Sequence, residues 1–467
     1  MLVSSLAFTA CEEKNNDLLK DKTQNEKVNE WIYSEMNNQY LYYKDIPKAS
    51  SLNFNQDSQD FFASLLSRQQ EMKTTSDGRE YFYSYLEVPE KSKAIYSANL
   101  TYGIEFLRYS SPAAAGSQIA RVLYVLKDSP AEKAGIKRGD FIYKVNNERL
   151  NATNYALLKS GSAITVYKAA YILNQAINKY EYVEYDTPVK LDAAQSIDEN
   201  PIHYSRVMQF GDRKIGYLVY NAFKYGPSED GVDFRYENEL RDLMKSFKNQ
   251  GVSDFILDLR YNGGGFLRTA QLLASTLVPA PELGSLMAYQ EMNDKLEKTN
   301  KEKELKFYTS SVINDANLNL DRLVVIGTRY TASASELIIN SLRPYIPVIH
   351  VGETTEGKNV GSYSIKNAKF PGYKLQPITI KIYNSLRQSN YRNGFVPDDV
   401  NSYSEIEFAR PFVAFGSLDD IYMQMSLRAL DVSIKQSQKV YGSNMDMPVL
   451  KCLGISEINN PKGLICE

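Results

Sequence analysis

Two short apolar runs separated by a helical segment constrain the fold of this chain more than any other feature. The first run, Val324–Gly327, ends in small residues, and Ser335-Glu-Leu-Ile-Ile then begins a helical pattern. A second run, Ile346–Val351, contains β-branched residues that predict another strand. Strand, helix and strand in this order predict parallel strands whose carboxyl ends lie at the same edge of one sheet.

Two side chains are expected to meet at that edge. Ser333 lies where the first strand passes into the helix, so its hydroxyl should be clear of neighbours and close to the positive end of the helix dipole. Lys358 lies in a glycine-flanked loop after the second strand, and it can act as a base if burial lowers its pKa from about 10.4 toward neutrality. We therefore expect a Ser-Lys dyad. The alternative is a capping box between Ser333 and Glu336, with Lys358 as a surface residue.

The chain has only two histidines, and each is an alternative candidate for the role of base. His350 lies inside the second apolar run and is predicted to be a strand residue. His203 lies far upstream in Asn-Pro-Ile-His-Tyr-Ser, where nothing resembles a poised base. A catalytic triad does not depend on chain order, so His203 remains the fallback.

A glycine-rich turn supplies candidate donors for an oxyanion. Residues 254–265 read Asp-Phe-Ile-Leu-Asp-Leu-Arg-Tyr-Asn-Gly-Gly-Gly, which predicts a buried strand that ends in three glycines. Without side chains, glycines leave their N–H groups accessible to an anion. The amide of Ala334, directly after Ser333, is the natural second donor of an oxyanion hole. The alternative is a tight turn with no further role.

The order of these motifs resembles the tail-specific, or carboxyl-terminal processing, serine peptidase family. The shared motifs are Asp-Leu-Arg-x-Asn-Gly-Gly-Gly, Thr-Ala-Ser-Ala-Ser-Glu and Gly-Glu-Thr-Thr-Glu-Gly-Lys, within residues 98–430. The resemblance implies that Ser333 is the nucleophile and that Lys358 is its base. It also implies an oxyanion hole formed by the amides of Gly264 and Ala334, and an α/β (crotonase/Clp-like) serine peptidase core.

The loop that carries the lysine departs from the family pattern. Members commonly have a glutamine four residues after the lysine, which orients it, whereas Ser362 occupies that position here. Serine is shorter and can hold the lysine only through a different geometry or a water molecule. Two alternatives to a serine endopeptidase therefore stay open. One is a catalytically silent homologue that binds peptides, and the other, suggested by the many tyrosines, is a lipoprotein that binds small hydrophobic molecules or glycans.

Residues 98–198 resemble a PDZ domain, and Ser129–Ile142 matches the helix, turn and strand common in bacterial PDZ modules. We expect an extended peptide to pair with an edge strand while its carboxylate binds N–H groups of the preceding loop. A helix at Ala152–Lys159 would form the far wall. The alternative is a β-rich spacer without a ligand. The predicted peptide-binding residues are Tyr102, Gly103, Ile104, Glu105 and Phe106.

The chain of 467 residues is too long for one core, and we expect a multidomain α+β fold with a mostly parallel sheet in the peptidase core. Within that core, helical spacing predicts a helix at Leu267–Leu277, and Asn293–Lys306 is polar enough to be a solvated helix or excursion. The expected parts are a lipoprotein signal and tether at 1–25, a helical domain at 26–97, a PDZ-like domain at 98–198, a peptidase core at 199–445 and a tail at 446–467.

The N-terminus resembles a bacterial lipoprotein signal. The apolar run Met1–Ala10 precedes Cys11, which would be lipidated after cleavage, and the polar segment Glu12–Lys27 would be the tether. We therefore expect a cell-envelope protein that is lipid-anchored to a bacterial membrane, facing the periplasm or the surface. The alternative is a frayed end with a free cysteine. Outside the cytoplasm Cys452 and Cys466 can form a disulfide, and otherwise they are two free thiols.

Composition excludes several other classes of function. A net charge of −2 without a basic patch gives no case for nucleic acid as a partner. Two histidines and three cysteines exclude His-rich and Cys₄ zinc sites, and we expect no metal and no cofactor. No apolar run has the length of a membrane span, so we expect contact with a membrane through a lipid anchor only. The expected partners are protein or peptide substrates, bound through their C-terminal tails.

Overall fold

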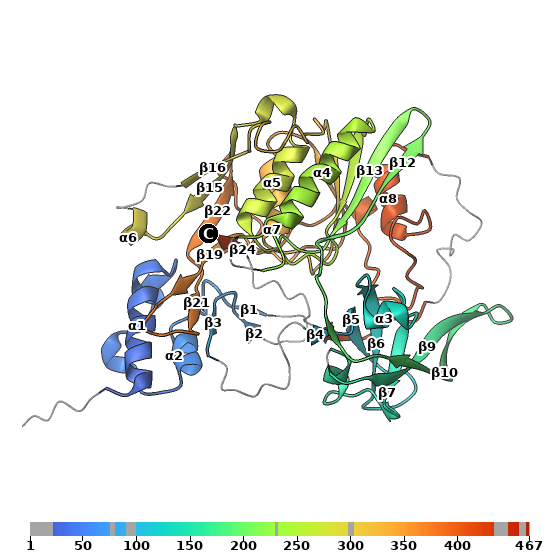
Figure 1. Cartoon of the computed structure of the whole chain (residues 1–467), viewed down its shortest axis with the longest axis horizontal. Helices are drawn as coiled ribbons and strands as arrows, with labels where there is room; N and C mark the ends of the chain where they lie inside the picture. Colours follow the sequence, from blue (N-terminus) through green and yellow to red (C-terminus); the bar gives the residue numbers. More distant parts are fainter. Residues whose placement is uncertain are drawn as a thin grey trace, which may run out of the picture.

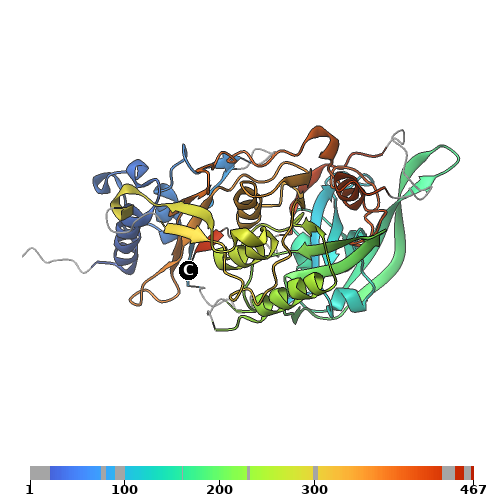
Figure 2. The same ribbon diagram turned by 90° about the horizontal axis from the view of Figure 1, so that it is seen from above.

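The protein is described here from a computed structural model, which describes residues 22–74, 80–89, 100–159, 161–228, 232–297, 303–433, 447–456 and 464–466. A helical N-terminal region lies on one side of an α/β core, and a β-rich region lies on the other (Figure 1 and Figure 2). The predicted multidomain α+β class is confirmed. Among the described residues, no helix combines the length and apolarity that crossing a membrane requires.

The core sheet is built from the strands that the apolar runs predict. All of its neighbouring strands are parallel except for the first, antiparallel pair, which confirms the mostly parallel sheet. Every residue of its two central strands is buried, as expected when both faces of a parallel sheet are covered. The strand order is β12 (Ile202–Phe210), β13 (Arg213–Tyr220), β14 (Asp254–Asp258), β17 (Leu323–Gly327) and β18 (Val348–Gly352).

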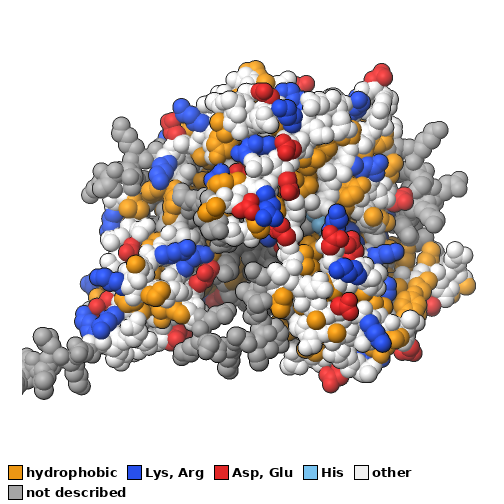
Figure 3. Space-filling view, in the orientation of Figure 1, with side chains coloured by type: hydrophobic (Ala, Val, Ile, Leu, Met, Phe, Trp, Pro, Cys, Tyr) orange, Lys and Arg blue, Asp and Glu red, His pale blue; other side chains and the backbone are white. Residues whose placement is uncertain are grey.

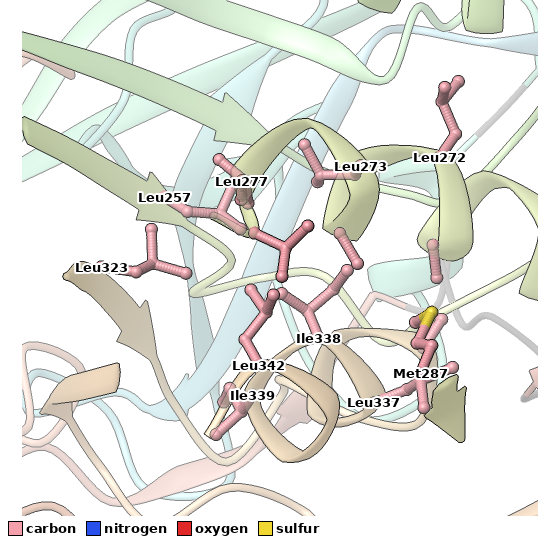
Figure 4. Packing of buried hydrophobic residues seen from close by; sticks show 14 of the residues in the cluster. Leu257, Leu272, Leu273, Leu277, Met287, Leu323, Leu337, Ile338, Ile339 and Leu342 are labelled. Atoms are coloured by element: carbon pink, nitrogen blue, oxygen red, sulfur yellow. The ribbon is translucent and has the colours of Figure 1, made fainter. Parts of the chain in front are cut away.

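Alternate residues of β17 face two different hydrophobic clusters. Val325 packs with α4 (Arg235–Asn249), α5 (Leu267–Leu277) and α7 (Ala334–Leu342). Figure 4 shows leucine and isoleucine side chains of α5 and α7 in this cluster, and the bounds of α5 agree with those predicted. Val324 faces the other cluster, which contains α8 (Ile421–Ala429) and residues of the β-rich region.

The β-rich region forms a sheet that includes a strand from the C-terminal end of the chain. In place of the predicted helix at 152–159 there is one 3₁₀ turn, η3 (Tyr155–Leu158). The side chain of Asn151 accepts hydrogen bonds from the backbone of Thr153 and Asn154, and such local bonds favour turns over helices. The strand order is β10 (Lys179–Leu191), β9 (Ile164–Asn174), β7 (Phe141–Val145), β6 (Gln118–Val125), β5 (Ile104–Ser110) and β23 (Cys452–Ile455). The short elements are α3 (Pro130–Lys133), β8 (Glu148–Arg149), and the pair β4 (Leu100–Thr101) and β11 (Gln195–Ser196).

The N-terminal region shares its hydrophobic cluster with the core instead of standing alone. Trp31 and Phe61 pack in one cluster with Leu375 and Ile378 of the core. A strand of this region also pairs with a strand of the core, because β3 (Tyr85–Glu87) lies beside β21 (Lys374–Gln376). The other elements are α1 (Gln24–Gln39), η1 (Tyr43–Asp45), η2 (Ala49–Ser51), α2 (Ser58–Ser64), β1 (Lys73–Thr74), β2 (Glu80–Tyr81) and β20 (Ile365–Lys366).

A further sheet corrects the prediction for Asn293–Lys306. Helix α6 covers only Asp294–Glu297, and β16 (Lys303–Lys306) pairs with β15 (Leu286–Glu291). The Lys and Glu residues that favour a helix locally are tolerated here because β16 is an edge strand with exposed side chains. The sheet continues through β22 (Ile380–Asn384), β19 (Val360–Tyr363) and β24 (Leu464–Cys466), and two short turns are η4 (Ala280–Glu282) and η5 (Asp399–Asn401).

Candidate active site

Ser333 occupies a strained turn directly before α7. Its backbone has φ 63° and ψ −110°, a conformation that L-residues rarely adopt and that clusters at functional sites. The side chain is only 2% exposed, so the predicted exposed hydroxyl is in fact buried. Among the described residues, none forms a hydrogen bond with Ser333 Oγ. The hydroxyl is therefore buried without a hydrogen-bonding partner among the described residues.

The carboxylate of Glu336 joins the serine turn to the lysine loop. Its Oε2 atom accepts hydrogen bonds from the N–H of Ser333 at 2.9 Å and from the N–H of Lys358 at 2.7 Å. Its Oε1 atom accepts from Thr355 Oγ1 at 2.6 Å and from the N–H of Gly357 at 2.7 Å. Burial raises the pKa of Glu336 to about 7, although these bonds act to lower it. The bond from the Ser333 N–H belongs to the capping box that the sequence suggested as an alternative, whereas the bonds to the lysine loop were not predicted.

Lys358 is buried in the predicted loop after β18, with 4% of its surface exposed. Burial lowers its pKa to about 8, and the nearby carboxylates of Glu71, Glu356 and Glu336 oppose that shift. The pKa is thus close to the range that a general base requires. Because Ser333 Oγ has no partner among the described residues, the two side chains are not hydrogen-bonded. Catalytic hydrogen bonds are often longer in the absence of substrate.

The glycine turn lies against the serine. Gly264 has φ 115°, and a Cβ atom on it would lie 2.9 Å from Ser333 Cβ and 3.1 Å from the nitrogen of Ala334. As the first residue of α7, Ala334 has an N–H with no acceptor inside the helix. The N–H of Gly264 donates to Asn262 Oδ1 at 2.9 Å. An oxyanion at this position therefore requires Asn262 to release or share that N–H.

Further contacts fix the glycine turn to the rest of the core. The carbonyl of Asn262 accepts from the N–H of Ala332 at 3.1 Å and from Ser335 Oγ at 2.8 Å. Two residues earlier, the fully buried guanidinium of Arg260 is paired with three carboxylates, those of Asp258, Glu405 and Asp420. Glu405 also pairs with Arg138 of the β-rich region at 2.9 Å. The sequence signal for this cluster was an arginine two residues after an aspartate at the end of a buried strand.

The two histidines lie in apolar surroundings. His203 packs against the rings of Tyr124 and Phe415, with centroids 5.0 and 5.3 Å away, and burial lowers its pKa to about 4. His350 lies in β18 as predicted, and burial lowers its pKa to about 4 as well. Ser362 is 1% exposed, and its hydroxyl has no hydrogen-bond partner among the described residues. Ser362 therefore does not take over the lysine-orienting role of the glutamine found at this position in other members of the family.

The predicted peptide-binding edge is occupied by the chain itself. The strand expected at Ile104 exists as β5, but β23 pairs with its outer edge. The loop before it is also engaged, since the N–H of Gly103 donates to Thr101 Oγ1 at 2.9 Å and the hydroxyl of Tyr102 donates to the carbonyl of Ser162. A peptide can pair with this edge only after β23 leaves it.

The remaining predicted sites concern cysteines and metals. Cys11 lies outside the described residues, as does the side chain of Cys466. Cys452 is a free thiol, half-buried on β23. Within the described ranges, no group of three or more His, Cys, Asp and Glu side chains is placed to hold a metal ion.

Comparison with known proteins assigns the three main regions. The profile of peptidase family S41 matches residues 214–399, that of the peptidase S41 N-terminal domain matches 27–85, and that of a PDZ domain matches 121–158. A Bacteroides fragilis protein assigned as an S41 protease has a crystal structure with a TM-score of 0.74 and 28% identity, covering 86% of this chain and 97% of that one.

Curated relatives agree with this assignment. The carboxy-terminal processing protease CtpA of Bacillus subtilis is 27% identical over 235 residues, which are 50% of this chain and 43% of that protein. The carboxyl-terminal-processing protease of a Picosynechococcus species is 25% identical over 316 residues, 67% of either chain. The chain thus spans less than half the length of the Bacillus relative. Together with the arrangement of Ser333, Glu336 and the glycine turn, these matches identify a peptidase S41 domain at residues 214–399, preceded along the chain by regions that match the S41 N-terminal domain and a PDZ domain.

Proposed function

We propose that this protein is a serine endopeptidase that hydrolyses peptide bonds in partly unfolded proteins or C-terminal tails through a dyad of Ser333 and Lys358. The observation that carries the proposal is one carboxylate oxygen of Glu336 that accepts from the backbone of both residues. It holds at one point the backbones of a buried serine, whose hydroxyl has no hydrogen bond among the described residues, and of a desolvated lysine. The names of the relatives, which are carboxyl-terminal processing proteases, support the substrate class.

The proposed reaction uses the chain's own groups at each step. Neutral Lys358 takes the proton of Ser333 Oγ as that oxygen attacks the scissile carbonyl carbon. The N–H groups of Ala334 and Gly264 bind the negative oxygen of the tetrahedral intermediate. The protonated lysine then gives its proton to the leaving amine, and an acyl-enzyme remains. Water, deprotonated by the lysine, hydrolyses the ester and restores the serine.

The location and partners belong to the same proposal. The motif around Cys11 supports a lipid-anchored protein of the bacterial cell envelope. Substrate tails would pair with the β5 edge of the PDZ-like region. On the face in Figure 3, side chains of both charges are interspersed. That face therefore presents no large area of one charge to attract a strongly charged partner. The rival is a silent peptide-binding homologue, favoured by the bond between Gly264 N–H and Asn262.

A serine-reactive fluorophosphonate probe tests the proposal directly. We expect the folded wild-type chain to be labelled once, at Ser333, faster as the pH rises through the lysine pKa of about 8, because the neutral lysine activates the hydroxyl. Peptide mass spectrometry identifies the adduct, and Ser335→Ala is the matched control that keeps labelling. A folded wild type that resists the probe between pH 6 and about 10, a range that brackets the lysine pKa, contradicts the proposal and favours the silent homologue.

A further inference from the structure

The lysine of the proposed dyad is contacted by an aromatic side chain from the N-terminal region. Its Nζ atom lies 4.5 Å from the centroid of the Tyr83 ring. Tyr83 stands between β2 and β3, whereas Lys358 lies in the core. Since Ser362 Oγ is not hydrogen-bonded to the lysine, the ring is a neighbour placed to fix the lysine head group. An aromatic face attracts an ammonium group by about 0.5–2 kcal/mol.

Tyr83 is itself held by the lysine loop. Its hydroxyl donates to Glu356 Oε1 at 2.9 Å, and the hydroxyl of Tyr81 donates to the same oxygen. The two tyrosine rings meet edge to face, with centroids 5.8 Å apart and planes at 77°. Glu356 lies two residues before Lys358, so this loop and the tyrosine segment restrain each other.

The tyrosine segment is in turn fixed to the core. Ser84 Oγ donates to Glu71 Oε2 at 2.9 Å and accepts from the N–H of Ile378 at 2.9 Å. Glu71 is 3% exposed and also accepts from the hydroxyl of Tyr40 at 2.7 Å. The ring of Tyr83 is therefore part of a packed structure and not of a loose flap.

We propose that Tyr83 is a positioning residue for Lys358 and that the S41 N-terminal domain completes the active site, in the role that glutamine fills in other members. This inference rests on the proposed function. The ring excludes water from the ammonium group, which favours the neutral, basic form, and its face limits the rotamers of the lysine. The charged groups that face the lysine are Glu71, Glu336 and Glu356, and they favour the protonated form. Burial outweighs these carboxylates in the lysine pKa. Loss of the ring removes both its shielding from water and its attraction for the ammonium group, and we expect the admitted water to have the larger effect and to raise the pKa.

The pH profile of kcat/KM tests this role with three variants. For Tyr83→Ala we expect the apparent pKa to rise from about 8 by at least one unit, with about tenfold lower activity at neutral pH. Tyr83→Phe keeps the ring and should stay within about threefold of wild type at an unchanged pKa. Tyr43→Ala is the matched control, because it removes a ring from Lys295, 3.8 Å from its centroid, in the same region.

The outcomes separate this inference from the proposed function. An active wild type whose Tyr83→Ala variant keeps the same pKa and activity overturns the positioning role alone, and so does a Tyr83→Phe variant as impaired as Tyr83→Ala. A wild type that is neither labelled nor active overturns both. If Tyr83→Ala does not fold, Tyr83→Val is measured instead, and the same upward shift is expected.

The C-terminal tail carries a second, independent inference. Strand β23 is antiparallel to β5, with Cys452 opposite Tyr109 and Ile455 opposite Leu107. Its chain therefore runs toward the loop at Gly103, the direction expected of a bound peptide. The N–H of Ser456 donates to the carbonyl of Phe106 at 2.8 Å.

The same tail reaches the neighbourhood of the proposed lysine. Beyond Ser456, the structure describes β24, which is parallel to β19 with Ile465 opposite Ser362. Strand β19 begins at Val360, two residues after Lys358, and Figure 1 shows the C-terminus beside it. One tail therefore lies along the strand edge predicted to receive peptides and along an edge beside the active site.

The contact at β5 is short enough to exchange. Strand β23 has four residues, all only half-buried. Each backbone hydrogen bond contributes a net of about 0.5–1.5 kcal/mol, so the strand itself adds little. Its firmest anchor is the buried Ser456, whose hydroxyl accepts from the N–H of Phe106 and donates to Glu105. Because it is tethered, the tail nevertheless competes at an effective concentration on the order of millimolar.

We infer that residues 447–456 are an autoinhibitory segment that substrate must displace from β5 before it reaches the active site. The inference rests on the proposed function. A chain that ends at residue 446 should show a KM for an unfolded protein lowered by at least about threefold, because no competitor occupies β5. A synthetic peptide of residues 447–467 should restore the inhibition in trans. Hydrolysis rates and peptide binding to β5, measured by fluorescence polarisation, report the two effects.

A point variant keeps the inference testable if the truncated chain does not fold. Ser456→Pro removes the N–H that bonds to Phe106 in the full-length protein and should lower KM in the same direction. Val449→Ala, at a tail residue that is 75% exposed, should change nothing. A probe-labelled, folded protein whose truncated and Ser456→Pro forms keep the wild-type KM overturns the tail inference and leaves the proposed function intact. A protein that the probe never labels overturns both.

Discussion

Ser333→Ala should abolish hydrolysis of an unfolded test protein while leaving the thermal melt nearly unchanged. The substitution removes the attacking oxygen, and loss of a nucleophile lowers kcat by at least about 10³-fold in serine peptidases. Stability should change by less than about 1 kcal/mol, because Ser333 Oγ has no hydrogen bond to lose among the described residues. Steady-state hydrolysis and thermal unfolding of the two purified proteins measure both quantities.

Ser335 is the natural control for that experiment. Its hydroxyl lies in the same turn but donates to the carbonyl of Asn262 at 2.8 Å. Ser335→Ala should therefore cost about 0.5–1.5 kcal/mol of stability, because the carbonyl keeps its bond from Ala332, and it should keep measurable activity. The opposite pattern, in which Ser335→Ala is inactive and Ser333→Ala is active, would identify Ser335 as the nucleophile.

Lys358→Arg should be nearly inactive, with kcat/KM at least about 10²-fold below wild type. A guanidinium stays protonated at any pH that the fold tolerates, so it cannot accept the serine proton. In the wild type the active form is the neutral lysine. Because burial lowers the pKa of Lys358 to about 8, kcat/KM should rise with pH below that value and level off above it. The measurement is a pH series at substrate concentrations below KM.

A second lysine near the loop provides the comparison. Lys73 donates to the carbonyl of Arg392 at 2.6 Å, and Lys73→Arg should keep both the rate and the pH profile. Wild-type-like activity in Lys358→Arg would remove the dyad. Attention would then pass to His203, although its ring is enclosed by Tyr124 and Phe415.

Local pattern was sufficient to predict the centre of the fold. Buried parallel strands require continuous apolar runs, so β14, β17 and β18 were visible in the sequence, and α5 was predicted with its observed bounds. The same order of elements predicted that the turn of Ser333 and the loop of Lys358 would lie at one edge.

Contacts between distant segments were beyond the reach of local pattern. Residues 293–306 were predicted to be a solvated helix or excursion, and strand β16 was missed because its charged residues favour helix locally and only its position at a sheet edge makes it a strand. Tyr83 meets Lys358 because β3 pairs with β21, in a small sheet that joins the N-terminal region to the core. The pairing of β23 with β5 joins segments from opposite halves of the chain, and no periodicity in either records its partner.

The buried carboxylate of Glu405 restricts how this molecule can move. Its Oε2 atom is bonded by Arg138 of the PDZ-like region at 2.9 Å and by Arg260 of the core at 3.0 Å. A hinge rotation of the PDZ-like region would pull one guanidinium away and leave charge uncompensated in a dry interior, at a cost of about 3–5 kcal/mol. Detaching the peripheral strand β23 from β5 therefore requires less free energy than opening the interface between the PDZ-like region and the core.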